Sequence, residues 1–179
     1  MVLGISQTLG RSVPELLKEY KAATNDSVKI ESLSSLAGAY ANVNIDSAFL
    51  VGELALEQAK LGNYRYLEGN AYVSLGEVYD ITGQFEPALE NINQGLEIFL
   101  QLKNNKGIAR AYNARGLARL YASRNLQAAS TDFEASRKLC LELGDLVEVA
   151  KNGHNLGQVY HKEEDYPAAL KNYLLARNL

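Results

Sequence analysis

Phe85-Glu86-Pro87-Ala88 is one of four places where a large apolar residue is followed, three positions later, by an alanine. The other three are Ile45-Asp46-Ser47-Ala48, Leu126-Gln127-Ala128-Ala129 and Tyr166-Pro167-Ala168-Ala169. The successive alanines of this motif are 40, 41 and 40 residues apart. A fixed period of this length indicates a repeat architecture, in which each unit buries its apolar face against its neighbours.

Three further sets of residues recur at a similar spacing. They are Leu36, Leu75, Gly116 and Leu156; Tyr40, Tyr79, Leu120 and Tyr160; and Leu61, Leu102 and Leu143 at expected helix ends. Apolar residues at helical spacing predict two helices per unit, over 65–82 and from Pro87 to about 103, then 106–123 and 125–143, then 146–162 and 166–178. The sequence therefore predicts an all-α solenoid of antiparallel helix pairs, with about nine helices and no strands.

The organisation that we expect is one repeat domain over residues 1–179. Ser12-Val13-Pro14-Glu15 has the pattern of a capping box with proline in the first turn, which predicts a lone capping helix within residues 12–30. The repeats are expected at 31–70, 71–110, 111–150 and 151–179. Ala48, Ala88, Ala129 and Ala169 are expected where two helices cross, because a small side chain permits close approach there.

Composition narrows the class of protein. The 179 residues carry a net charge of −3, without the strong basic excess that a nucleic-acid binder usually has. The sequence has no apolar run of the roughly 20 residues that a membrane span needs, and the start lacks the pattern of a signal peptide. These features predict a cytoplasmic protein that binds neither nucleic acid nor membrane.

Residues that could carry chemistry are few. His154 and His161 are seven residues apart on one predicted helix, a spacing at which two ligands rarely meet one ion. Cys140 lies in a leucine-rich helix and is expected to be a small buried hydrophobe. The sequence has no glycine-rich phosphate loop. We expect no catalytic residue, no cofactor and no metal site, and hence no enzyme.

Two segments carry a resemblance to a known family. Ser74-Leu75-Gly76-Glu77-Val78-Tyr79 and Asn155-Leu156-Gly157-Gln158-Val159-Tyr160, each followed by a turn and the alanine motif, resemble tetratricopeptide repeats. The period of 40–41 residues is similar to the longer-helix variant of that family, found in sensory or regulatory regions of bacterial signalling proteins. The resemblance implies a right-handed superhelix. It is imperfect in the third unit, where Gly116-Leu117 breaks the pattern, and in the first, where Ala37 replaces glycine.

The resemblance also implies a binding groove, because in that family the first helix of each pair lines a concave surface. The residues carried over to this surface are Ser34, Gly38, Ala41, Asn70, Val73, Ser74, Glu77, Ala111, Ala114, Arg115, Ala118, Lys151, His154, Asn155, Gln158 and Lys162. Either Arg115 and the fourth unit bind a carboxylate or acidic segment of a partner, or these charges belong to a solvated helix face. The family's clamp for chaperone C-termini is not expected, because Ser34 and Gly38 occupy its places.

The function that we expect is a protein-interaction scaffold, as the regulatory module of a larger bacterial signalling protein. The alternative is a structural spacer or oligomerisation module of a larger enzyme. The last predicted helix carries Leu170, Tyr173, Leu174, Leu175 and Ala176, more apolar residues than one preceding helix pair can cover. An exposed apolar patch usually marks an interface. We therefore expect the natural sequence to continue, and this chain to form a homodimer through its last helix.

Overall fold

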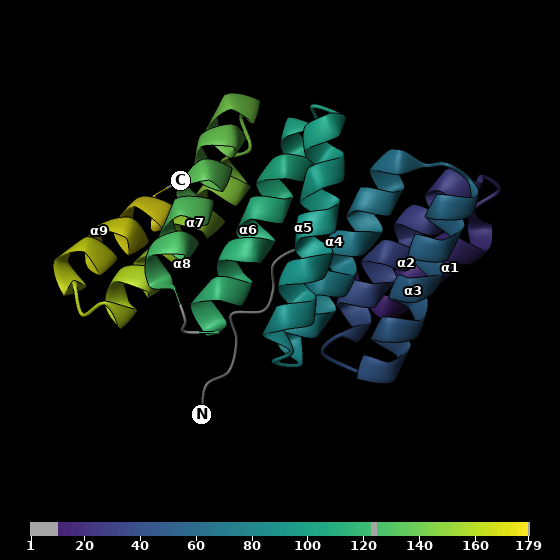
Figure 1. Cartoon of the computed structure of the whole chain (residues 1–179), viewed down its shortest axis with the longest axis horizontal. Coiled ribbons are helices and arrows are strands. Elements are labelled where there is room, and N and C mark those ends of the chain that lie inside the picture. Colours follow the sequence, from purple (N-terminus) through teal and green to yellow (C-terminus); the bar gives the residue numbers. More distant parts are fainter. Residues whose placement is uncertain (1–10, 123–124, 179) are drawn as a thin grey trace.

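A computed structural model describes residues 11–122 and 125–178 of the chain. Within these residues the chain forms nine α-helices and no strands, and Figure 1 shows them side by side in chain order. The helices are α1 (Val13–Ala22), α2 (Asp26–Tyr40), α3 (Ile45–Leu61), α4 (Arg65–Ile81), α5 (Phe85–Gln101), α6 (Asn105–Tyr121), α7 (Leu126–Leu143), α8 (Leu146–Lys162) and α9 (Tyr166–Arg177). The predicted all-α solenoid of helix pairs is confirmed.

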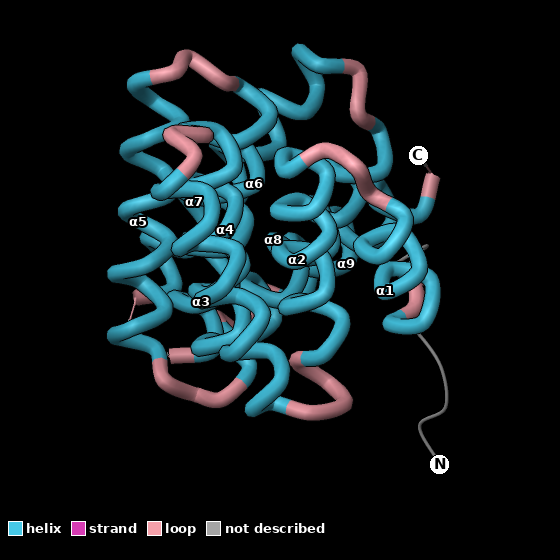
Figure 2. The backbone as a smooth tube through the Cα atoms, turned by 90° about the vertical axis from the view of Figure 1, so that its right-hand side faces the viewer, coloured by secondary structure: helices cyan, strands magenta, loops and turns pink. Residues whose placement is uncertain are grey.

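Two layers of helices make up the array. Each of α2, α4, α6 and α8 pairs with the helix that follows it, and neighbouring members of this inner set also contact one another. The outer helices α3, α5, α7 and α9 make no such direct contacts among themselves within the described residues. Figure 2 shows α3, α5 and α7 together on one side of the molecule. The inner helices are therefore closer together than the outer ones, and the array is concave on their side.

Short polar caps set the helix boundaries. The side chains of Asn44, Asn104 and Asn125 each accept a hydrogen bond from a backbone N–H in the first turn of the following helix, at 2.7–2.9 Å. Asp145 and Asp165 do the same at α8 and α9. Each cap satisfies one of the N–H groups that have no partner inside the helix.

Most turns between helices contain one residue with positive φ. Gly83 and Gly144 have φ values of 74° and 73°. The pattern of glycines predicts the same for Gly62, but this is wrong: Gly62 has φ −83°, and the next residue, Asn63, has φ 55°. Asparagine tolerates the left-handed region better than most residues do.

The core is continuous along the array. One cluster joins α4, α5 and α6 through Val73, Ile92, Phe99 and Ile108. A second joins α6, α7 and α8, with Phe133 at its centre. Ala48, Ala88, Ala129 and Ala169 are all buried, as expected for crossing positions.

The repeat boundaries differ from the expected ones. Positions 71, 111 and 151 fall inside α4, α6 and α8, so divisions there would cut helices. The helix pairs instead run over 26–61, 65–101, 105–143 and 146–177, after the single helix α1. No helix in the described part of the chain has both the length and the apolar character needed to cross a bilayer.

Candidate functional site

A groove on the concave side is the candidate site. Its volume is about 580 Å³, within the range of ordinary ligand pockets. Side chains from α2, α4, α6 and α8 line it, together with three from α7. Those α7 residues reach the groove because α6 and α8 are packed less closely than α4 and α6 are.

One position on each inner helix contributes to the groove. Counted from the helix starts, Glu31, Asn70, Arg110 and Lys151 are equivalent, and all four line the groove. Asn70 and Arg110 are half-buried, and Glu31 and Lys151 are exposed. The repeat therefore sets a row of polar side chains across the concave face.

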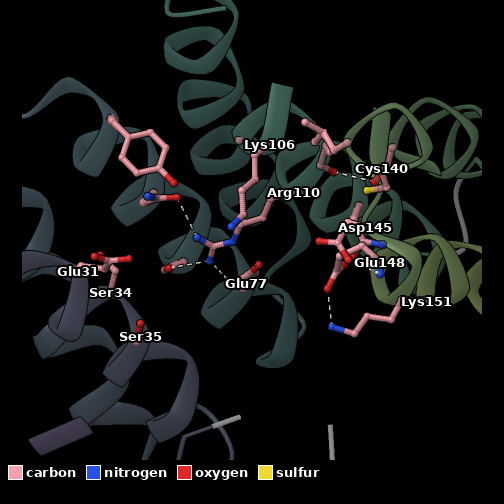
Figure 3. A pocket seen from close by; sticks show the side chains of 18 residues that line it. Glu31, Ser34, Ser35, Glu77, Lys106, Arg110, Cys140, Asp145, Glu148 and Lys151 are labelled. Carbon is pink, nitrogen blue, oxygen red and sulfur yellow. Dashed lines mark hydrogen bonds and ion pairs between the residues drawn. The ribbon is translucent and has the colours of Figure 1, made fainter. Parts of the chain in front are cut away.

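Arg110 lies at the centre of the groove and is held from the neighbouring unit (Figure 3). Its Nη1 donates to Asn70 Oδ1 at 3.2 Å, and its Nη2 donates to Ser74 Oγ at 2.9 Å and to Glu77 Oε2 at 2.8 Å. All three acceptors come from α4, so the guanidinium is fixed before any ligand arrives. Its side chain is still 38% exposed.

The α8 side of the groove is acidic on balance. Lys151 Nζ pairs with Glu148 Oε1 at 2.5 Å, and Asp145 caps the helix beside them. Figure 3 shows these residues across the groove from Glu31. Lys151 is thus neutralised by its own helix, which leaves one net negative charge at this side.

The α7 residues give the floor of the groove. Ser136 Oγ donates to the backbone oxygen of Ala109 at 2.8 Å, which fixes α7 against α6. Cys140 is 4% exposed, as expected for a small buried hydrophobe. Burial raises the pKa of its thiol, so the reactive thiolate is disfavoured.

Five residues expected in the groove do line it. They are Ser34, Asn70, Ser74, Glu77 and Lys151. Ser34 and Ser74 are nearly buried, so Asn70, Glu77 and Lys151 offer most of the accessible surface of this set.

Five of the expected groove residues are buried in the core instead. Val73, Ala111 and Ala118 are each 0% exposed. Ala114 belongs to the same cluster, and Ala41 packs in another beside α3. Small apolar side chains on the inner helices are needed for close packing against the outer ones, and this requirement places them away from the groove. Gly38 is half-buried and is not among the lining residues.

Arg115 lies away from the groove, between α6 and the outer helices. Its Nε and Nη2 donate to the two carboxylate oxygens of Asp132 at 3.0 and 2.7 Å, and its Nη1 donates to Asn93 on α5. Arg119 also donates to Asp132, at 2.6 Å. Asp132 is 2% exposed, so this is a largely buried charge cluster. Arg115 therefore does not offer its charge to a ligand in the groove.

The remaining α8 residues lie outside the groove. His154 packs against the ring of Tyr173 on α9, and Asn155 is buried. Gln158 is half-buried and does not line the pocket. Lys162 lies at the end of α8, where its Nζ donates to the backbone oxygen of Leu120 at 3.1 Å. Of this expected basic face, only Lys151 reaches the groove.

Sequence reasoning missed the central residues of the groove, among them Glu31, Lys106, Arg110 and Asn113. The signal that finds them is the spacing of the helix starts. Aligned in this way, Asn70 corresponds to Arg110. Aligning Leu75 with Gly116 instead shifted the third unit by one residue.

The described residues contain no group of three or more His, Cys, Asp or Glu side chains arranged to hold a metal ion. What the groove offers is a set of hydrogen-bond donors, acceptors and charges along an open surface. Such a surface is suited to binding a ligand.

Comparisons with known proteins give the fold. No family model matches the sequence, and no curated protein matches it. Among solved structures, the chain is similar to BtubC (BKLC) from P. vanneervenii, with a TM-score of 0.70 and 20% sequence identity. The match covers 92% of this chain and 68% of that chain. At this identity the similarity shows a shared helical architecture alone.

Proposed function

We propose that this chain is a protein-interaction scaffold that holds an extended segment of a partner protein in its concave groove. The observation that carries the proposal is the row Glu31, Asn70, Arg110 and Lys151, which places one polar side chain from each of the four inner helices in one groove. Extended concave surfaces of this kind are how solenoid proteins bind their partners.

Preorganisation supports the proposal. Arg110 is held by three acceptors on α4, so a ligand that pairs with it does not have to order the side chain. Avoiding that ordering cost improves affinity, because an immobilised long side chain costs about 0.5–1.5 kcal/mol on binding. Asn113 and Ser35 add uncharged polar groups along the same groove.

The proposed role is regulatory rather than catalytic, in keeping with the resemblance of Ser74–Tyr79 and Asn155–Tyr160 to tetratricopeptide repeats. The groove residues include no nucleophile paired with a base, and the pKa of the Cys140 thiol is raised. On this proposal the chain is the partner-binding module of a bacterial signalling protein.

A second candidate, self-association, is favoured by the outer surface of α9. Tyr166, Leu170 and Leu175 are each more than half exposed, and Leu174 is 39% exposed. Apolar side chains gathered on one helix favour a function in assembly. This role is compatible with partner binding, since α9 lies in the outer layer and contributes nothing to the groove.

Site-specific photo-crosslinking separates partner binding in the groove from binding elsewhere. A photoreactive amino acid is placed at Ser35 or Lys106 in the groove, and at Glu90 or Lys138 on the exposed surfaces of α5 and α7. Both groove positions should crosslink the same cellular protein through one segment, identified by mass spectrometry. Equal crosslinking from the two outer positions, or none from the groove, would show the proposal to be wrong.

A further inference from the structure

The charges of the groove follow a fixed order across the inner helices. Glu31 on α2 is negative, Lys106 and Arg110 on α6 are positive, and the set of Asp145, Glu148 and Lys151 at α8 is negative on balance. Figure 3 shows the three groups in this order, with Arg110 and Lys106 between the other two.

Internal pairing removes some of these charges from play. Glu77 is neutralised by Arg110, and Glu148 by Lys151. Among the described residues, Glu31 and Lys106 have no ion pair, and Asp145 has only its capping hydrogen bond. The charges left for a ligand are therefore negative at α2, positive at α6 and negative at α8.

Arg110 adds directed donors to the central positive charge. A guanidinium has five N–H groups, and the described acceptors on α4 take three of them. The two that remain, with the ammonium of Lys106 one helical turn away, can bind a carboxylate. Lys106 and Arg110 are four residues apart on one helix and so share a face.

The helix spacing converts this order into a spacing along a peptide. Packed helices lie about 8–10 Å apart, and an extended chain advances about 3.3 Å per residue. A segment that crosses the inner helices therefore moves about three residues from one helix to the next. From α2 to α6 is two such steps, and from α6 to α8 is one.

We propose, as a refinement that rests on the groove function above, that the partner segment is extended and carries a basic, an acidic and a basic residue in that order from α2 to α8. The basic side chain at α2 faces Glu31. The acidic side chain, about six residues along, faces Lys106 and Arg110. The second basic side chain, about three residues further, faces Asp145. A uniformly acidic or uniformly basic segment meets repulsion at one or more of these groups.

A displayed library of random 14-residue peptides, selected on the full chain, tests this order. Enriched peptides should share the basic–acidic–basic spacing in one chain direction. Lys106→Glu should weaken their binding about tenfold, because reversal replaces an attraction of up to about 1 kcal/mol with a repulsion of similar size. Changing the acidic residue of the peptide to lysine should restore binding to Lys106→Glu. Glu31→Lys should weaken binding and be rescued by a glutamate at the first basic position.

Matched controls lie outside the groove. Lys138→Glu and Glu90→Lys make the same changes of charge on exposed outer positions and should leave binding within twofold. Peptides that are sensitive to Lys106→Glu but lack the charge order would overturn this refinement and leave the groove function standing. If no enriched peptide responds to Lys106→Glu, the refinement is wrong, and the crosslinking experiment decides separately whether the groove binds a protein at all.

Discussion

Glycine at the inner helix crossings lets the two layers approach closely. Gly76, Gly116 and Gly157 are equivalent when the helix starts are aligned, and each lies against a large side chain of the paired outer helix. A Cβ on Gly76 would be 2.5 Å from Ile92 Cγ1 and 2.9 Å from the backbone oxygen of Ala88. The backbone oxygen cannot move away without shifting α5.

We therefore expect Gly76→Ala to lower the free energy of unfolding by about 1–3 kcal/mol, the usual cost of overpacking. Gly38→Ala is the matched control, since it also lies within an inner helix but a Cβ there meets nothing within 4 Å. That change should stabilise the protein by up to about 1 kcal/mol, because alanine favours the helix. Urea denaturation of both variants checks the pair, and equal effects would contradict the crossing assignment.

Arg115 and Asp132 replace a different pair of residues found in the neighbouring units. The position of Arg115 is occupied by Leu75 in the second unit and Leu156 in the fourth, and that of Asp132 by Asn91 and Asn172. The side-chain amides of Asn91 and Asn172 each donate to a carbonyl four residues earlier, at 2.9 and 3.0 Å. The third unit thus exchanges an apolar residue and an amide for a charge pair.

Asp132→Asn alone should destabilise the protein by about 1–3 kcal/mol, because it leaves two partly buried guanidinium groups without their carboxylate. Adding Arg115→Leu restores the pair found in the neighbouring units. We expect the double variant to unfold within about 1 kcal/mol of the wild type. A double-mutant cycle by urea denaturation measures this coupling. Additive effects would contradict it.

At the scale of the helices, much of the architecture follows from the sequence. The alanine motif and the polar caps give the helix pairs to within a few residues, because period and capping are local properties of the chain. The repeat boundaries are wrong because a period of 40 residues has no intrinsic starting point. Only the turns set one.

The groove is harder to predict from the sequence, because one substitution disturbs the repeat. With Arg115 in place of the leucine, the nearest match to Leu75 is Gly116, and this moves every assignment on α6 by one residue. One residue turns a helix by about 100°. That rotation exchanges Arg110, in the groove, for Ala111, in the core.

The end of α4 contains a carboxylate in an unfavourable place. Asp80 is the last residue but one of the helix, and its Oδ1 is buried without a hydrogen-bond partner among the described residues. Burial, with a further contribution from Glu77, raises the pKa of Asp80 from 3.8 to about 6. The negative charge at a helix C-terminus is also opposed by the helix dipole.

This carboxylate should make stability depend on pH. Because its pKa is higher in the folded state, folding is favoured by protonation, so its unfavourable contribution is full above about pH 6 and disappears as the pH falls towards 4. Asp80→Asn should melt at a higher temperature than the wild type at pH 8, and this advantage should shrink at pH 5. Glu90→Gln, at an exposed position of α5, is the control. An advantage of the same size at both pH values would show that ionisation of Asp80 is not its cause.

At the scale of the whole molecule, the two layers separate two kinds of surface. The inner layer carries polar residues that are held in place by neighbouring units, as Arg110 is by α4. The outer layer ends in α9, whose exposed side chains are largely apolar. A partner segment and a second copy of the chain would therefore bind at different places, and variants can remove one interaction without affecting the other.

The last prediction concerns α9. Leu174 lies where the other outer helices α5 and α7 carry the exposed polar residues Asn93 and Glu134, so the solenoid itself does not require an apolar side chain there. We expect the chain to form a two-fold dimer through this helix, because a patch that complements itself closes as a symmetric pair. Light scattering should show mass increasing towards that of a dimer from low to high micromolar concentration. Leu174→Glu with Leu175→Lys should give a monomer with an unchanged melting temperature, while Leu50→Glu, at an exposed leucine of α3, should leave the dimer intact. A wild-type chain that stays monomeric at high micromolar concentration would exclude this interface and leave the groove as the surface for binding proteins.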